Sequence, residues 1–81
     1  MEPQIIKEVK KYEDEEKYYY GVSKTEFHKL VTNPRIFEVE LKEGNRICLS
    51  VEFPFMEDYM GFYIITFNIN DGSIDDISSN D

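Results

Sequence analysis

The sequence contains one histidine, His28, and one cysteine, Cys48, the residue types most often used for acid–base and thiolate catalysis. A catalytic pair of this kind needs the two side chains to meet in space together with an orienting polar group. Neither residue lies in a local signature of such an enzyme. We interpret His28 as a half-exposed residue on a short helix and Cys48 as a small strand residue. We therefore expect a protein that is not an enzyme.

The acidic segment Asp71–Asp76 resembles part of a calcium-binding loop. Aligning Gly72 with the glycine of that loop, however, places Phe67 and Ile69 where oxygen ligands are required. Asn-Asp-Gly is also a strong hairpin-turn signal, and we prefer that interpretation. With one histidine and one cysteine the chain offers no zinc ligand set. The sequence predicts no metal site and no cofactor.

Glu40-Leu41-Lys42 has the spacing of the acid and lysine in many metal-dependent nucleases, where the acid holds Mg²⁺ and the lysine faces phosphate. A further upstream acid in a cleft and a surface that tolerates nucleic acid would both be needed. The strong negative charge of the chain opposes the second requirement. We interpret the segment as a solvated strand edge.

The charges are distributed unevenly along the chain. Residues 1–46 contain ten acids and all nine bases, whereas residues 47–81 contain seven acids and no base, so about −7 of the formal charge of −8 lies in the second part. Bare nucleic acid and anionic membranes are met with clustered Lys and Arg, so this distribution excludes them as expected ligands. The sequence predicts a protein partner with a basic surface, such as a nucleic-acid-binding protein or a toxin.

Three surfaces are candidates for binding that partner. The loop 54–61 combines aromatic and methionine side chains, which are enriched at interfaces, with acids that complement Lys or Arg; alternatively, its apolar residues fold back over the open end of a small core. The outward face of the predicted sheet carries further acids. Alternatively, this face is an ordinary one that is solvated or is covered by a helix or a second subunit. The candidate residues are Phe55, Met56, Glu57, Asp58 and Tyr59 in the loop and Glu38, Glu40 and Glu52 on the sheet. The run Glu13–Glu16 is a third candidate surface, which we interpret as a solvated helix end.

These surfaces lead to two functional hypotheses. The first is a small acidic binding protein that blocks or modulates a basic macromolecular site, in the manner of inhibitors, immunity proteins and nucleic-acid mimics. The second is a self-associating structural module that uses the outer sheet face or an exposed strand edge. The sequence leaves the choice between monomer and homodimer open.

The predicted fold is α+β, with two N-terminal helices packed on one face of a three- to four-stranded antiparallel meander. An amphipathic pattern predicts a helix over 3–17, and Tyr18–Val22 fits either a strand or a helix. A capping box at Ser23–Glu26 begins a second helix, which Asn33-Pro34 ends. Its predicted buried face is Phe27, Leu30 and Val31.

From Arg35 the apolar residues alternate with a period of two, which indicates strands. If Lys42 faces Arg46 across the turn, Leu41 faces Ile47, Val39 faces Leu49 and Phe37 faces Val51, and all these apolar residues share one face. A third strand over about 62–69 would have Tyr63, Ile65, Phe67 and Ile69 inside, and a short strand near 73–77 would follow. We expect one domain over residues 1–81, with 78–81 as a frayed tail. The single cysteine and the lack of a membrane-length apolar run predict a cytoplasmic protein.

Overall fold

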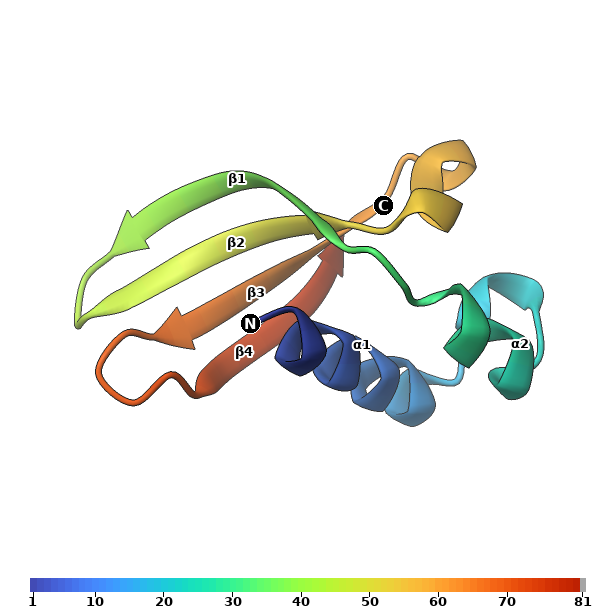
Figure 1. Cartoon of the computed structure of the whole chain (residues 1–81), viewed down its shortest axis with the longest axis horizontal. Helices are drawn as coiled ribbons and strands as arrows, with labels where there is room; N and C mark the ends of the chain where they lie inside the picture. The colour runs from blue at the N-terminus through green and yellow to red at the C-terminus, as the bar shows by residue number, and fades with distance from the viewer. Residues whose placement is uncertain (81) are drawn as a thin grey trace.

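The structure, a computed structural model, contains two helices followed by a four-stranded antiparallel sheet in the order β1-β2-β3-β4 (Figure 1). It describes residues 1–80, and of Tyr59 it describes only the backbone. The predicted α+β arrangement is confirmed. The elements are α1 (Glu2–Glu16), the 3-10 turn η1 (Tyr19–Gly21), α2 (Lys24–Leu30), β1 (Arg35–Lys42), β2 (Arg46–Glu52), the 3-10 helix η2 (Pro54–Tyr59), β3 (Phe62–Asn68) and β4 (Ile74–Asn80).

Helix α1 buries a single stripe of side chains, Ile5, Val9 and Glu13, which are spaced four residues apart. Residues at this spacing lie above one another on a helix, so all three point at the sheet. Lys17 is the residue that caps the C-terminal end of the helix. Its backbone is left-handed (φ 59°), and its N–H donates to the carbonyl oxygen of Glu13. The predicted span of 3–17 differs from the observed one by one residue at each end.

The segment Tyr18–Val22 forms neither a strand nor an α-helix, the two structures that its sequence pattern suggested. It contains η1, in which Tyr19 and Tyr20 have positive φ angles of 48° and 55°. Bulky residues seldom adopt this conformation. The turn reverses the chain and stacks the ring of Tyr20 on that of Phe27 in α2.

The predicted cap of the second helix is confirmed by a hydrogen bond, because the Glu26 N–H donates to Oγ of Ser23 at 3.1 Å. Phe27 and Val31 are buried as expected, whereas Leu30 is only half-buried.

The predicted register of the first hairpin holds for three pairs: Lys42–Arg46, Leu41–Ile47 and Val39–Leu49. It is wrong at Phe37. A β-bulge between Ile36 and Glu38 inserts one extra residue, so Ile36, and not Phe37, lies opposite Val51. The bulge turns Phe37 to the opposite face, where its ring meets that of Phe62 edge-on at 5.3 Å. A one-residue slip in a strand reverses the face of every side chain beyond it, which is why a pattern-based pairing fails at this point.

The second hairpin is longer than predicted. Tyr63, Ile65 and Phe67 are buried as expected, but Ile69 lies beyond the end of β3 and is exposed. The chain turns at 69–71, and β4 then runs from Ile74 to Asn80. Residues 78–80 are thus paired with β3 instead of forming the expected tail, and Asp81 lies outside the described residues.

The core lies between α1 and the β2–β3–β4 part of the sheet and extends to one end of it, where α2, η1 and η2 gather (Figure 1). Two hydrogen bonds fix α1 along β4: Gln4 Nε2 donates to the carbonyl of Gly72 at 2.9 Å, and the hydroxyls of Tyr12 and Ser79 lie 3.2 Å apart. Strand β1 lies at the edge remote from α1. Within residues 1–80, no helix combines the length and the apolar character needed to cross a membrane.

Candidate functional site

All eight residues of β1 are exposed, although four of them are large and apolar. The exposed fraction is 78% for Leu41 and 59% for Val39. Ile36, Val39 and Leu41 belong to the inner face of the sheet, the face toward α1, because they pair with Ile47, Leu49 and Val51 of β2. We call the strand Arg35–Lys42 the β1 edge, since β2 is its only neighbour among the described strands.

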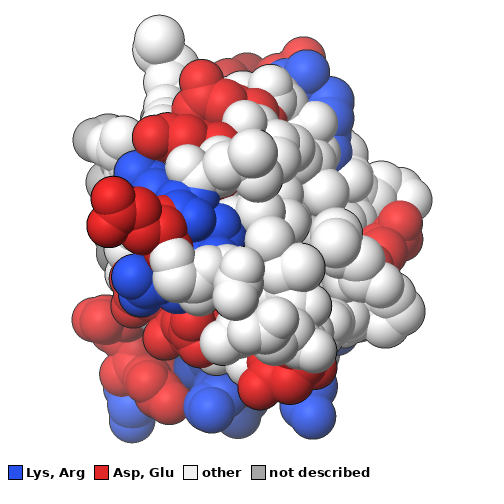
Figure 2. All heavy atoms as spheres, turned by 90° about the vertical axis from the view of Figure 1, so that its left-hand side faces the viewer, with Lys and Arg blue, Asp and Glu red and all other residues white. Residues whose placement is uncertain are grey.

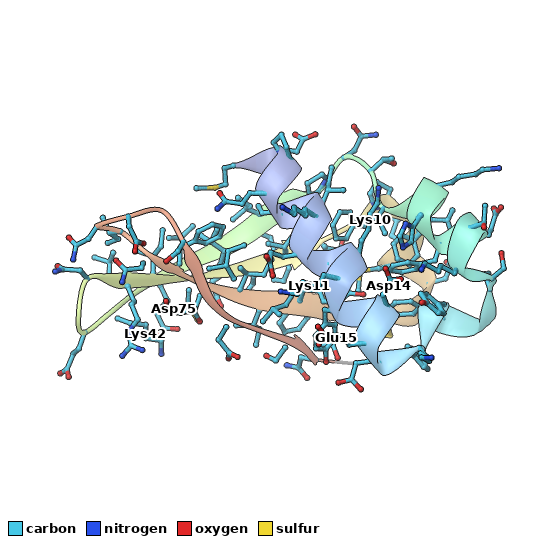
Figure 3. All side chains as sticks on the ribbon, turned by 90° about the horizontal axis from the view of Figure 1, so that it is seen from below. Lys10, Lys11, Asp14, Glu15, Lys42 and Asp75 are labelled. Atoms are coloured by element: carbon cyan, nitrogen blue, oxygen red, sulfur yellow. The ribbon has the colours of Figure 1, made fainter. Side chains whose placement is uncertain are left out.

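The position of α1 explains why this part of the inner face is uncovered. The helix lies on the β4 side of the sheet and is remote from β1 (Figure 1). Seen from below, the sheet continues well past the helix to the hairpin ends that carry Lys42 and Asp75 (Figure 3). The molecule is therefore elongated, at 37 × 21 × 19 Å. Figure 2 shows this end of it, where a broad area without Lys, Arg, Asp or Glu is bordered by groups of both charges.

The outer face of the first hairpin holds the predicted acids Glu38, Glu40 and Glu52, but it is not simply acidic. Lys42 Nζ lies 3.0 Å from Oε1 of Glu40, a hydrogen bond that raises the pKa of Lys42. An Arg35 guanidinium nitrogen lies 3.1 Å from Oε1 of Glu52. Only Glu38 of the three makes no ion pair within residues 1–80. The face therefore carries charges of both signs.

The loop 54–61 folds into η2, and its apolar residues divide between the core and the surface. Met56 is fully buried, so the expectation that it forms an exposed anchor is wrong. Phe55 is half-buried, with its ring edge-on to Tyr20 at 5.3 Å and to Phe27 at 5.8 Å. Phe53, Phe55 and Met56 close the end of the core beside α2. The alternative interpretation of this loop, that Phe55, Tyr59 and Met60 fold back over the core, therefore holds for Phe55 and is wrong for Met60.

The remaining residues of this loop stay at the surface where the structure describes them. Glu57 and Asp58 are exposed, and Met60 is 86% exposed with a left-handed backbone (φ 55°). The side chain of Tyr59 lies outside the described part, so its predicted role stays a prediction. Two segments that carry acids, η2 and the β3–β4 hairpin, lie at opposite ends of the molecule (Figure 1), so the acids of the two segments do not form one patch.

A buried polar network that the sequence interpretation missed joins α1 to β3. Glu13 is only 2% exposed, and the Tyr63 hydroxyl donates to its Oε2 at 2.6 Å. The Tyr20 hydroxyl in turn donates to that of Tyr63 at 3.0 Å. Burial, reinforced by the hydrogen bond with Glu13, raises the pKa of Tyr63 far above that of an ordinary tyrosine.

Glu13 was expected to be part of a solvated helix end, which is wrong for this residue. The signal that could have found it is its spacing, four residues after Val9 and eight after Ile5. A carboxylate on the buried stripe of a helix requires polar partners inside the protein, and tyrosine hydroxyls are suitable donors.

Beside this network, an open pocket of about 360 Å³ lies at the C-terminal end of α1. Its described lining combines two tyrosines, two carboxylates and one hydroxyl, from Tyr12, Glu13, Glu16, Tyr18 and Ser79. No base is among these lining residues. Aromatic faces and carboxylates both attract cations, so the pocket has the composition of a site for an ammonium or guanidinium group.

His28 and Cys48 belong to separate groups of contacts. His28 Nε2 lies 3.0 Å from Oδ1 of Asp14, and the Tyr19 hydroxyl donates to the same oxygen at 2.8 Å. The hydrogen bond with His28 lowers the pKa of Asp14. Cys48 Sγ lies 3.4 Å from Oγ1 of Thr66 on the outer face.

Asp71, in the turn between β3 and β4, accepts hydrogen bonds from within that turn. Asp71 Oδ1 accepts hydrogen bonds from the N–H and the hydroxyl of Ser73, at 2.9 and 2.6 Å. These bonds, with the left-handed backbone of Gly72 (φ 72°), are those of a polar hairpin turn. Over the described part of the chain, no three side chains of the metal-ligating types lie close enough together to hold a metal ion.

Comparison of the chain with models of protein families, with curated proteins and with solved structures gave no match.

Proposed function

We propose that this protein is a small acidic, non-enzymatic binding protein that holds a protein partner at the β1 edge. The observation that carries the proposal is the exposure of every residue of β1, including Val39 and Leu41 on the face that forms the core elsewhere in the sheet. Monomeric proteins seldom leave a long apolar edge strand open, because such a strand pairs readily with another chain.

The β1 edge offers a partner both backbone and side-chain contacts. An edge strand presents a row of N–H and C=O groups that an added strand can pair with. A partner that also covered Leu41 and Val39 would bury most of two side chains, which is worth about 3 kcal/mol in apolar transfer free energy. Affinity and a fixed register would then come from the same surface.

The opposite edge of the sheet shows how this chain protects a strand that is not used for binding. Strand β4 carries the exposed acids Asp75 and Asp76, and its apolar residues Ile74 and Ile77 are half-buried against the core. Exposed charges discourage pairing with other chains, but β1 carries four of them as well, so the difference between the edges lies in their apolar residues. Because β1 lacks this apolar cover and presents Val39 and Leu41, the two edges differ in the property that matters for association.

Cross-linking at defined positions tests this proposal. A photoreactive benzophenone amino acid is placed at Val39 or Leu41, and at Met60, which is more exposed than either, as the control. In cells that make the protein, we expect adducts from positions 39 and 41 and none from position 60. The absence of adducts from β1, or equal adducts from position 60, would contradict the proposal. The mass of the adduct identifies whether the partner is this chain or another protein.

A second candidate function is the blocking or modulation of a basic macromolecular site, and the pocket at the C-terminal end of α1 favours it. Its tyrosines and carboxylates suit a lysine or arginine side chain of a partner. The exposed acids Glu57 and Asp58 of η2 would add electrostatic steering. A cytoplasmic location is part of both proposals, since the single cysteine, Cys48, forms no internal disulfide.

A titration with N-acetyl-lysine methylamide, followed by NMR at low salt, tests the second candidate. We expect saturable shifts at Tyr12, Tyr18 and Ser79 that weaken in high salt and in Glu16→Gln. Shifts that do not saturate, or that Glu16→Gln leaves unchanged, would rule it out.

A further inference from the structure

We propose that the partner seated on the β1 edge is a second copy of this chain, with the two β1 strands antiparallel across a two-fold axis so that the two sheets form one continuous sheet. The inference rests on the proposed function, because it uses the same edge. Strand pairing at an exposed edge is a common way to build a two-fold dimer.

The sequence of β1 selects one register for this pairing. Glu38-Val39-Glu40-Leu41-Lys42 is self-complementary when Glu40 lies on the two-fold axis. Glu38 then faces the partner subunit's Lys42, and Val39 faces the partner subunit's Leu41, each pair occurring twice. Side chains directly opposite each other in an antiparallel pair lie on the same face. The outer face therefore joins opposite charges, while the inner face joins apolar residues.

The neighbouring registers are less favourable. Centring the pair on Val39 sets Glu38 against the partner subunit's Glu40 on both sides of the axis, and like charges directly opposite each other are destabilising. Centring it on Leu41 moves Val39 opposite the partner subunit's Glu43, which belongs to the turn. The Glu40 register contains a single pair of like charges, on the axis, and each of those carboxylates already binds Lys42 of its own chain at 3.0 Å.

The charge balance of the edge favours a second copy over a uniformly basic partner. Glu40 and Glu52 are paired with Lys42 and Arg35 of the same chain. A basic strand laid along β1 would meet these cations as well as the acids. A second β1 strand carries both acids and bases, and in the Glu40 register its Lys42 meets Glu38 of the first strand on each side of the axis. The interface is small, so we expect a weak dimer that forms at high protein concentration.

The experiment is sedimentation analysis of charge-swap variants over a concentration series. In Glu38→Lys, lysine faces lysine across the interface; in Lys42→Glu, glutamate faces glutamate. Each variant alone should dissociate about tenfold more readily than the wild type, because two attractive pairs become repulsive. An equimolar mixture restores opposite charges at both pairs, so we expect a heterodimer with an affinity near that of the wild type.

Two controls keep the result interpretable. Met60→Lys changes an exposed side chain on η2 and should leave the dimer unchanged. Thermal unfolding of each variant confirms that it is folded, which we expect because residues 38 and 42 are exposed.

Each outcome bears on the proposal. Rescue of dimerisation by mixing supports both the second copy and its register. A wild-type protein that stays monomeric at millimolar concentration overturns the inference, and the proposed function then stands if benzophenone at Val39 captures a different protein. If neither charge swap weakens the dimer, its interface lies elsewhere on the molecule, and this inference is overturned. If cross-linking also gives no adducts from β1, the proposed function is overturned too. Weakening without rescue overturns the register.

Discussion

The hydroxyl of Tyr63, near the start of β3, donates a 2.6 Å hydrogen bond to Oε2 of Glu13 on α1, and both side chains are buried. This bond is a buried polar contact within a helix–sheet interface that also includes Ile5, Val9 and Ile65, whereas the Gln4–Gly72 and Tyr12–Ser79 hydrogen bonds are exposed. A buried polar pair is satisfied in one geometry only, whereas apolar surfaces tolerate sliding. We infer that it fixes where α1 lies on the sheet, and hence which part of the inner face remains open.

Replacing Glu13 with alanine should lower the free energy of unfolding by about 2 kcal/mol, because the change removes the acceptor of a buried hydroxyl and leaves a void. Glu15→Ala is the matched control on the same helix: residue 15 is exposed, and the expected change is within about 0.5 kcal/mol. Urea unfolding of the two variants and the wild type measures both values. Equal effects at positions 13 and 15 would contradict the importance of the network.

The stability of the protein at alkaline pH should depend on Tyr63. Its pKa is raised in the folded state by burial and by the hydrogen bond with Glu13, so above about pH 10 the unfolded chain loses a proton that the folded protein keeps. The free energy of unfolding therefore falls as the pH rises from there, by about 1.4 kcal/mol per pH unit for this one group. Tyr63→Phe removes that contribution.

Urea unfolding at pH 9, 10 and 11 compares the slopes of the two proteins. We expect Tyr63→Phe to be less stable than the wild type at pH 9 but to lose stability less steeply above pH 10. Parallel slopes would show that the Tyr63 hydroxyl is not held in its neutral form by the fold.

Asp14 should make the stability of the protein depend on pH in the acidic range, where stability is lost as the pH falls. The hydrogen bond with His28 lowers the pKa of Asp14 in the folded state, so its contribution to stability is present above the ordinary aspartate pKa of about 4 and is lost as the pH falls below it. The difference in unfolding free energy between the wild type and Asp14→Asn should be larger at pH 6 than at pH 2.5. Asp58→Asn, at an exposed site on η2, is the control and should show no such change. A difference that is independent of pH would count against the Asp14–His28 contact.

The sequence predicts the order of the two α-helices and the strands because these elements have local signals, but it does not predict η1 or η2. The Ser23 cap, the period of two after Arg35 and the Asn-Asp-Gly turn depend only on neighbouring residues. The register of the first hairpin was correct up to the bulge. At Phe37 the pattern offers two apolar residues in succession, Ile36 and Phe37, and the choice between them depends on the distant ring of Phe62.

The candidate site was less predictable, because exposure is decided by how far a helix extends over a sheet. The alternating pattern marks Val39 and Leu41 as core residues, and they lie on the correct face, but α1 lies on the β4 side of the sheet and leaves β1 uncovered. Glu13 shows the converse error. The run of four acids that contains Glu13 predicts that this residue is exposed to solvent. Glu13 is buried because it lies on the same stripe of the helix as Ile5 and Val9.

Amide hydrogen exchange of the whole chain, measured at low and at high protein concentration, tests the role of β1 most directly. A strand with one open edge leaves part of its amides unprotected, and pairing with a second copy protects them. We predict protection that rises with concentration along Arg35–Lys42 and stays constant along Ile74–Asn80, the other edge strand. Protection of β1 that does not depend on concentration, or a rise confined to β4, would contradict the account.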